Sequence, residues 1–530
     1  MTTSEALHGR HATYMLKGRF PSVLKIQVLN ESEAMYRKLG ILAVLIICPF
    51  LDHTTHAETK ASTSSRPNIL WIMLEDWGTD LSCYGTQAVH TPHIDQLASE
   101  GVRYTRAFTT APVCSTSRSA MLTGHYQNYT HTNQHRTEKK RPLPYGIEPL
   151  PLLLSEAGYC TALGCGLSKK TDQNFTNKLG FTATNWSERK SGQPFFAQVT
   201  EATTHRTWKR DEENPIDEKI VELPPYYPDT PMIRRDWANG LEQLQLADKT
   251  IGKILQKLQD DGLRDNTLVV LIGDNGRCMP RGKQFLYDGG ISIPLLMRWP
   301  GHIKPETVCD DLVNTLDICK TIVDLAGVQP PHPLHGMNLF ETAIKERPYI
   351  FAARDKMDDT HDAMRAVRSK RYKYIRNLMP ERAYCQYNEY KEKRYPTLAV
   401  LNAMHQEGTL SPVQSRFMAA QKPAEELYDL KTDPWETKNL INEASLQKTA
   451  DAMRQALQTW QEDMRDEGVT NAFREGGWSA DYPTRSLQAW KEIVEKFRPY
   501  VFRKPGEKIR PPDDFISQTG LPNRKHESEK

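Results

Sequence analysis

The sequence lacks the features that mark several common classes of protein. Its 69 basic and 66 acidic side chains leave a net charge of only +3, too little for the positive field with which a protein attracts nucleic acid. Its nine cysteines are scattered without a Cys-x-x-Cys pair, which argues against a zinc cage or a small disulfide scaffold. No internal repeat is present. We therefore expect a globular protein with a large core and no nucleic-acid partner.

The N-terminal part has the pattern of an export signal. Arg37-Lys38 precede the apolar run 40–51, and Thr55-His56-Ala57 resembles a cleavage site. The run is too short for a stable membrane span, although an internal hydrophobic helix is an alternative. Met35 lies just before the run, as a start residue would. The expected segments are a non-native extension at 1–34, a signal peptide at 35–57 and a polar linker at 58–66. Export to a periplasm or the exterior follows.

Apolar runs alternate with helical periodicity over residues 67–340. Buried strands are expected at 68–74, 159–163, 194–200, 267–272 and 293–299. Helices are expected at 92–100, 150–157, 237–261 and 312–326. This alternation predicts an α/β domain with a large, mixed, mainly parallel sheet between helices.

A different pattern follows over residues 341–503. Short strands are expected close together at 349–353, 363–367 and 372–376, and an amphipathic helix near 446–460. These elements predict a smaller C-terminal α+β subdomain. The tail at 504–530 is polar and rich in proline and lysine, and we expect it to be extended or disordered.

The stretch Val113–Gly124 places Cys114 at the start of a helix-like run and Arg118 four residues later. Such a helix would direct its positive N-terminus toward an anion, and Arg118 would lie on the same face one turn on. The alternative is a buried cysteine before an ordinary capped helix.

Two predicted strands end in polar pairs, Glu75-Asp76 and Asp274-Asn275. The carboxyl ends of parallel strands are where ligands bind in open α/β sheets, and oxygen donors suit a hard cation, Ca²⁺ ahead of Mg²⁺. Helix capping and turn formation are the alternative for either pair alone. His205 follows a third strand, where it can donate to an anion or protonate a leaving group.

The stretch at Cys114 resembles the signature of the formylglycine-dependent sulfatases, with Thr116 standing where proline is usual. Residues that match are Cys114, Ser117, Arg118, Leu122, Thr123 and Gly124. The segment 426–440 looks like the C-terminal motif of that family. Within it, the chain looks most like the heparan N-sulfatase (sulfamidase) group, on the spacing from Asp274 to Lys283 and on Thr204-His205-Arg206. The resemblance implies the alkaline-phosphatase-like sulfatase fold.

The resemblance also implies a role for each matching residue. Cys114 would be oxidised to formylglycine by a maturation enzyme, and calcium would be held by Glu75, Asp76, the modified Cys114, Asp274 and Asn275. The sulfate would be clamped by Arg118, Lys170 and Lys283, with His205 assisting the leaving group. Asp172 replaces a histidine of the family pattern, and His125, His131 or His135 is a candidate replacement.

The basic loop 125–141 follows the nucleophile directly and is expected to border the substrate site. Expected substrate-binding residues are His125, His135, Arg136 and, from a second basic loop, Arg281. The expected partner is a sulfated glycan or a small sulfated sugar, with N-sulfoglucosamine as the leading single substrate. Two alternatives stay open: a phosphoesterase or phosphonate hydrolase of the same superfold, and a non-catalytic binder of sulfated glycans if Thr116 prevents maturation.

Overall fold

The computed structural model describes residues 66–136, 139–166, 170–470 and 485–513. All of them belong to one compact unit that begins at Ser64. The expected extension, signal peptide and linker up to residue 65 lie outside the described residues, as does the tail beyond residue 513. No helix in the described part is both long and apolar enough to cross a membrane.

A seven-stranded sheet with strand order β4-β5-β1-β6-β7-β2-β8 forms the centre of the unit. Its strands are β1 (Asn68–Leu74), β2 (Val102–Tyr104), β4 (Cys160–Leu163), β5 (Phe195–Glu201), β6 (Thr267–Gly273), β7 (Leu295–Arg298) and β8 (Thr307–Cys309). Only the two pairings of β7 are antiparallel. The predicted mixed, mainly parallel sheet is therefore confirmed.

Strand β1 shows why the sheet is buried on both faces. Leu70, Ile72 and Leu74 belong to one hydrophobic core, and the alternate residues belong to a second core on the other face. Successive side chains of a strand point to opposite faces, so a continuous apolar run requires cover on both sides. Burying one such side chain contributes about 1.5–3 kcal/mol.

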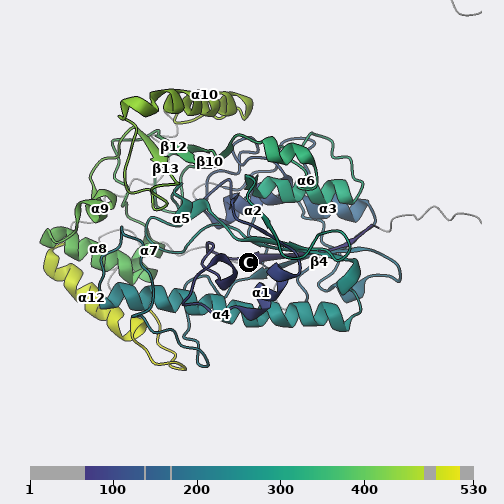
Figure 1. Ribbon diagram of the computed structural model, residues 1–530, viewed down its shortest axis with the longest axis horizontal. Coiled ribbons are helices and arrows are strands. Elements are labelled where there is room, and N and C mark those ends of the chain that lie inside the picture. The colour runs from purple at the N-terminus through teal and green to yellow at the C-terminus, as the bar shows by residue number, and fades with distance from the viewer. Residues whose placement is uncertain (1–65, 137–138, 167–169, 471–484, 514–530) are drawn as a thin grey trace, which may run out of the picture. The chain divides into compact units, whose positions relative to one another are not determined.

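Helices cover the two faces of the sheet (Figure 1). On one face lie α1 (Pro92–Ser99) and α4 (Pro231–Asp260); on the other lie α2 (Cys114–Thr123), α3 (Leu150–Glu156) and α6 (Thr315–Leu325). Helix α4 begins six residues earlier than the apolar periodicity predicts, because Thr230 caps it and Pro231 occupies its first position.

The C-terminal part forms a four-stranded antiparallel sheet of the predicted kind. Its strands are β10 (Ile350–Arg354), β11 (Met364–Arg368), β12 (Tyr372–Asn377) and β13 (Glu425–Asp429), in that order. The amphipathic helix α10 (Gln447–Asp463) packs on β11 and β12. Val367 and Leu427 share a hydrophobic core with Ala120 of α2, so this small sheet is joined to the helix that carries Cys114.

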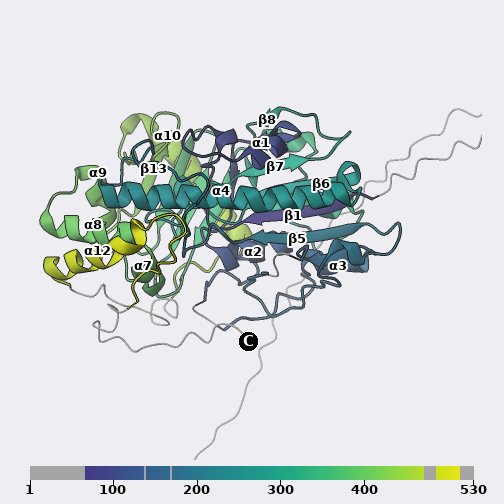
Figure 2. The same cartoon turned by 90° about the horizontal axis from the view of Figure 1, so that it is seen from below.

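Further helices that the periodicity did not predict surround the C-terminal sheet. They are α5 (Asp288–Ile291), α7 (Glu389–Arg394), α8 (Pro396–Glu407), α9 (Pro412–Ser415) and α12 (Leu487–Val501). Helices α8 and α12 pack on each other and on α4 (Figure 2). A short parallel pair of strands, β3 (Ala107–Phe108) and β9 (Val313–Asn314), lies outside both sheets. Short 3-10 helices are Ser82–Tyr84, Trp186–Glu188, Arg264–Asn266, Thr342–Glu346, Arg416–Met418 and Ala444–Leu446.

Candidate active site

The first residue of α2, Cys114, lies where the ends of several strands meet. Its thiol donates to Asp76 Oδ1 at 3.1 Å and accepts from Lys283 Nζ at 3.2 Å. Burial raises the pKa of the Cys114 thiol well above its usual value, and the nearby Asp76 carboxylate raises it further. Because the thiolate is the reactive form, the unmodified side chain is a poor nucleophile at neutral pH.

Thr116 lies in the first turn of α2 and is buried. The N–H groups of this turn have no acceptor within the helix. Proline is therefore tolerated there, because its missing N–H removes no helical hydrogen bond. Threonine and proline at position 116 are therefore both compatible with a helix that begins at Cys114.

The structure brings together the two polar pairs at the ends of β1 and β6. The Asp76 backbone N–H donates to Asp274 Oδ1 at 2.9 Å, and Asn275 Nδ2 donates to Asp76 Oδ1 at 3.1 Å. Burial raises the pKa of Asp274 to about 6, helped by the charges of Asp76 and Glu75 and opposed by Arg118. Burial also acts to raise the pKa of Asp76, but the charges of Lys283 and His205 outweigh it and hold this pKa well below its usual value.

Three predicted cations surround these carboxylates. Arg118, one turn after Cys114, donates from Nε to Asp274 Oδ2 at 2.8 Å and from Nη1 to Thr200 Oγ1 at 2.9 Å. Lys283 Nζ lies 2.7 Å from Asp76 Oδ2. Lys170 forms an ion pair with Glu75 and remains one-third exposed. The three cations are therefore held by the acidic residues around Cys114, and Lys170 marks the solvent side of the site.

His205 also lies at this site. Its Nδ1 donates to the Arg206 carbonyl at 2.6 Å, and its Nε2 lies 3.6 Å from Asp76 Oδ2. The bond at Nδ1 fixes the tautomer, so Nε2 is the atom that can exchange a proton with a ligand. Burial lowers the pKa of His205, and the Asp76 charge offsets part of that effect.

The structure identifies which histidine of the basic loop lies nearest the nucleophile. His135 Nδ1 lies 2.6 Å from Ser115 Oγ, and its Nε2 lies 3.6 Å from Asp358 Oδ1. Of the other two candidates, His125 donates from Nδ1 to the Thr123 carbonyl at 2.7 Å, and His131 lines a separate cavity. His135 is thus the loop histidine that the fold places beside the residue after Cys114.

Asp172 and Arg136 complete the solvent side of the cluster. Arg136 Nη2 lies 3.3 Å from Asp172 Oδ2, and Lys170 Nζ lies 3.7 Å from the same oxygen. Burial acts to raise the pKa of Asp172, but the charges of Arg136 and Lys170 lower it well below its usual value. An anionic Asp172 in this position orients two cations that a negatively charged ligand would meet first.

Two predicted substrate-binding residues are not brought into this cluster. His125 lies beyond the C-terminal end of α2, which at ten residues is about 15 Å long. It is buried, and its ring packs 4.8 Å from that of His335. His125 therefore packs in the interior, about one length of α2 away from Cys114.

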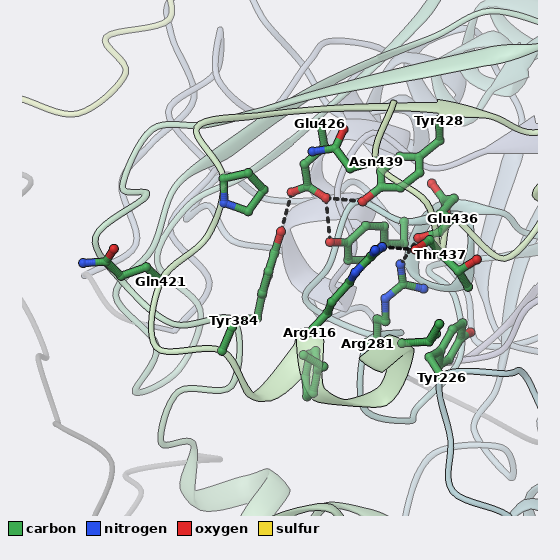
Figure 3. A pocket seen from close by; sticks show the side chains of 15 residues that line it. Tyr226, Arg281, Tyr384, Arg416, Gln421, Glu426, Tyr428, Glu436, Thr437 and Asn439 are labelled. Carbon is green, nitrogen blue, oxygen red and sulfur yellow. Dashed lines mark hydrogen bonds between the residues drawn. The ribbon is translucent and has the colours of Figure 1, made fainter. Parts of the chain in front are cut away.

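Arg281 points away from Lys283 although only Gly282 separates them. Its guanidinium donates to the carbonyls of Trp435 and Glu436 and lies 3.8 Å from the centre of the Tyr287 ring. It lines a cavity of about 260 Å³ in which buried Glu426 accepts hydrogen bonds from three tyrosines (Figure 3). Arg281 has a φ of +60°, and this left-handed backbone directs its side chain to that cavity.

Some contributors to the site were not among the residues predicted from the sequence. Ser115 and Asp358 bracket His135, and Thr200 accepts from Arg118. Thr200 ends the predicted strand before His205, so its position at a strand exit was a usable signal. Asp358 lies in a loop between two strands of the second sheet, and only the tertiary fold brings it here.

The donor set is suited to a divalent cation. Glu75 Oε2 and Asn275 Oδ1 are buried and have no hydrogen-bond partner among the described residues. Within the same region, ligand atoms of Asp76, Cys114 and Asp274 lie within 4.8 Å of one another. Buried oxygens of this kind are costly unless they are satisfied. Hard cations such as Ca²⁺ prefer oxygen ligands, so the residues fit such an ion.

Comparison with known proteins agrees with the fold and the site. The sulfatase family model matches residues 67–191 and 176–328, and a model of the C-terminal part of N-sulphoglucosamine sulphohydrolase matches residues 281–416. An ulvan-active sulfatase of Formosa agariphila is 33% identical over 458 residues, covering 76% of this chain and 76% of that protein. The chain therefore belongs to the sulfatase family.

Within the family the chain lies near the sulfamidase group. Human N-sulphoglucosamine sulphohydrolase is 26% identical over 477 residues, covering 76% of this chain and 92% of that protein. A solved structure described as a complex with D-glucosamine-2-N,6-O-disulfate has a TM-score of 0.55 at 18% identity and covers 76% of this chain and 99% of that one. The structural likeness supports the alkaline-phosphatase-like fold that the sequence predicts.

Proposed function

We propose that this sulfatase hydrolyses a sulfate ester or sulfamate on a sulfated carbohydrate, with a formylglycine made from Cys114 and a bound calcium ion. The observation that carries the proposal is the placement of Cys114 between Asp76 and Lys283, with Arg118 one turn behind it. A buried, protonated thiol has no evident use there as a nucleophile. A formylglycine hydrate supplies a hydroxyl nucleophile in its place.

Calcium would be held by Glu75, Asp76, Asp274, Asn275 and the modified residue 114. A bound divalent cation supplies Lewis acidity, which lowers the pKa of an oxygen nucleophile. Within the protein, Arg118 and Lys283 already balance Asp274 and Asp76. One oxygen of Glu75 and one oxygen of Asn275 still lack a partner among the described residues. The calcium ion would supply the positive charge that these two oxygens do not receive from the protein.

The remaining residues provide charge stabilisation and a proton. Arg118, Lys170 and Lys283 approach the site from three different elements, so together they can stabilise the charge that develops on sulfate oxygens. His205 Nε2 can protonate the departing oxygen or nitrogen of the sugar. Because Nδ1 of His205 is tied to a carbonyl, the proton moves through Nε2 alone.

The proposed substrate is a terminal sulfated sugar, with N-sulfoglucosamine as the leading single candidate. The match to the sulfamidase C-terminal model and the human relative supports it. The more similar ulvan-active sulfatase supports the wider class of sulfated polysaccharides. A panel of N-sulfated and 6-O-sulfated glucosamine, sulfated galactose, sulfated fucose and ulvan oligosaccharides decides between them. Sulfate release from O-sulfated sugars alone would overturn the sulfamidase assignment and leave the sulfatase assignment intact.

The deciding experiment compares an aryl sulfate with the matching aryl phosphate, with and without a chelator. We expect chelator-sensitive release of sulfate and little release of phosphate. Preferential cleavage of the phosphate would favour a phosphoesterase. Turnover of neither compound nor of any sulfated sugar, despite a modified Cys114, would contradict hydrolysis and favour a glycan-binding protein.

We also propose that the protein is exported, with cleavage after Ala57. The basic Arg37-Lys38 and the apolar run that follows them support this. Sequencing the N-terminus of the mature protein tests it, and a mature protein that begins before residue 40 would contradict it.

A further inference from the structure

A second cavity, of about 220 Å³, lies beside the loop that carries His135. One wall comes from the chain after α2 and contains Asn128, His131 and Gln134. The opposite wall comes from the chain after α10 and contains Arg465. Arg141 and Asp466 also line it. The cavity therefore lies between the basic loop and the C-terminal part of the chain.

Two buried oxygens on its wall lack hydrogen-bond partners among the described residues. They are Asn128 Oδ1 and Gln134 Oε1. Asn128 is 4% exposed, and its Nδ2 donates to Asp466 Oδ1 at 3.0 Å. Because only the amide nitrogen can donate to a carboxylate, this hydrogen bond fixes which way the amide faces. Its oxygen is consequently the free acceptor. A buried acceptor without a donor is costly, so both oxygens point to a ligand that brings hydroxyl donors.

The same cavity has charged side chains of both signs on its wall. His131, Arg141 and Arg465 line it, and the acidic lining residues are Asp466 and Glu467. The carboxylate of Asp466 is already engaged by Arg365 at 2.6 Å and 2.8 Å. Because Asp466 is neutralised in this way, Arg465 is the charged wall residue that can meet an oxyanion substituent of a ligand.

The wall of the cavity is connected to the site at Cys114. Gln134 is the neighbour of His135, which contacts Ser115. Asn174 Nδ2 donates to the carbonyl of Gln134 at 3.0 Å, and the Asn174 backbone N–H donates to Ser119 Oγ of α2 at 2.7 Å. These contacts hold the cavity wall against the helix that begins at Cys114.

We propose that this cavity binds the sugar unit next to the one that loses its sulfate, through its hydroxyl groups and an oxyanion substituent. The inference rests on the proposed function, because it takes the substrate to be a sulfated glycan. The hydroxyls donate to Asn128 Oδ1 and Gln134 Oε1. The oxyanion, a sulfate or a carboxylate, accepts from Arg465. The substrate is therefore at least a disaccharide with charge on two consecutive units.

The test uses Gln134→Met and Arg465→Ala in protein that also carries Cys114→Ala, so that no turnover occurs. Gln134→Met keeps the length of the side chain and removes an oxygen that has no partner, so folding is retained. Matched controls are Gln455→Met on α10 and Arg376→Ala on β12, both exposed and outside the cavity. Affinity is measured by calorimetry with hexasaccharides from ulvan and from heparin, each native, desulfated or carboxyl-reduced.

The comparison uses whichever native hexasaccharide binds most tightly. We expect each cavity substitution to raise its Kd about tenfold, equivalent to about 1.4 kcal/mol. The controls should leave the affinity unchanged. If the difference in affinity between Arg465→Ala and its control disappears on desulfation alone, the cavity binds a sulfate; if it disappears on carboxyl reduction alone, the cavity binds a carboxylate. Equal affinities of cavity variants and controls would overturn the proposal.

Kinetics with an otherwise native protein separate this inference from the proposed function. Gln134→Met should raise KM for the hexasaccharide and leave kcat and KM for an aryl sulfate unchanged. Equal KM values for the hexasaccharide would refute the cavity alone, with the sulfatase function intact. If no substrate releases sulfate, the proposed function fails, and the binding experiment still decides whether the cavity holds a charged sugar.

Discussion

Ser115 Oγ and His135 Nδ1 lie 2.6 Å apart, so the loop after α2 folds back onto the residue that follows Cys114. Asp358 lies at the other ring nitrogen of His135, at 3.6 Å. Three segments of the chain, from α2, the basic loop and the second sheet, are joined at this point. The ring of His135 thereby supports the start of α2, where Cys114 must be held in place.

The burial of His135 predicts a pH dependence of stability. Burial lowers the pKa of His135 to about 4, an effect that Asp358 opposes and Arg136 supports. In the unfolded chain the pKa is about 6.5. The neutral ring stabilises the fold fully above pH 6.5, and this contribution is lost as the pH falls toward 4. When the pH falls from 7 to 5, protonation of His135 in the unfolded chain should lower the free energy of unfolding by about 2 kcal/mol.

Urea unfolding of wild type and His135→Asn at pH 7 and pH 5 tests this. His335, whose pKa is also lowered to about 4 by burial, contributes equally to both proteins and cancels in the comparison. Between pH 7 and pH 5, the free energy of unfolding of His135→Asn should therefore fall by about 2 kcal/mol less than that of wild type. An equal loss of stability in the two proteins would show that His135 does not titrate in this range.

Cys114 should carry an aldehyde in active protein. The tryptic peptide 107–118 contains Cys114 as its single cysteine, so mass spectrometry reports its state directly. Cys114→Ala should lower kcat by at least about a thousandfold, as expected for loss of a nucleophile. Cys83→Ser, at a half-buried cysteine outside the cluster, is the matched control. A fully active protein with an unmodified thiol would refute the mechanism.

Asp274→Ala should remove metal and activity together. Asp274 contacts both Asp76 and Arg118, so its loss disrupts the acidic set and leaves buried Arg118 without its nearest carboxylate. Calcium should raise the melting temperature of wild type, because a ligand that binds only the folded state stabilises it, and should not raise that of the variant. Asp265→Ala, at an exposed aspartate, serves as control. Full activity of metal-free wild type would contradict a metal requirement.

Substitutions of Arg136 and of Lys139 should have different effects on the KM of small and large substrates. Arg136 is half exposed and pairs with Asp172 beside Lys170, so Arg136→Gln should raise KM for both an aryl sulfate and a sulfated oligosaccharide. Lys139 is exposed, and Lys139→Gln should raise KM only for the oligosaccharide, by a few-fold at most, and less at high salt. A raised KM for the aryl sulfate in Lys139→Gln would show that the loop closes further over the site.

Most of the long buried strands and the main helices of the α/β domain were predictable from the sequence, whereas the short strands β2 and β8 at the edge of the sheet were not. Asn68–Leu74 and Thr267–Gly273 are continuous apolar runs, and a run of this kind is stable only between two covered faces. Their polar ends follow from the same logic, because the carboxyl ends of parallel neighbours lie at one edge. Helix α4 was predictable in its apolar half, whereas its first turns depend on the cap at Thr230.

Arg281 and His125 show what periodicity alone could not predict. Arg281 stands two residues before Lys283, yet it points into a separate cavity. His125 stands seven residues after Arg118, yet it lies beyond the far end of α2. The left-handed backbone at Arg281 depends on contacts of the whole loop. Close spacing in sequence therefore did not place these side chains at the site.

The sequence by itself determined the fold class, the family and the residues at the strand ends, because those features depend on hydrophobic periodicity and on a short local motif. Only the tertiary structure decided that His135, rather than His125 or His131, meets Ser115, and that Asp358 stands behind it. These contacts join positions 20 and more than 200 residues apart along the chain. Such pairings follow from the packing of the second sheet against α2, and local pattern carries no information about them.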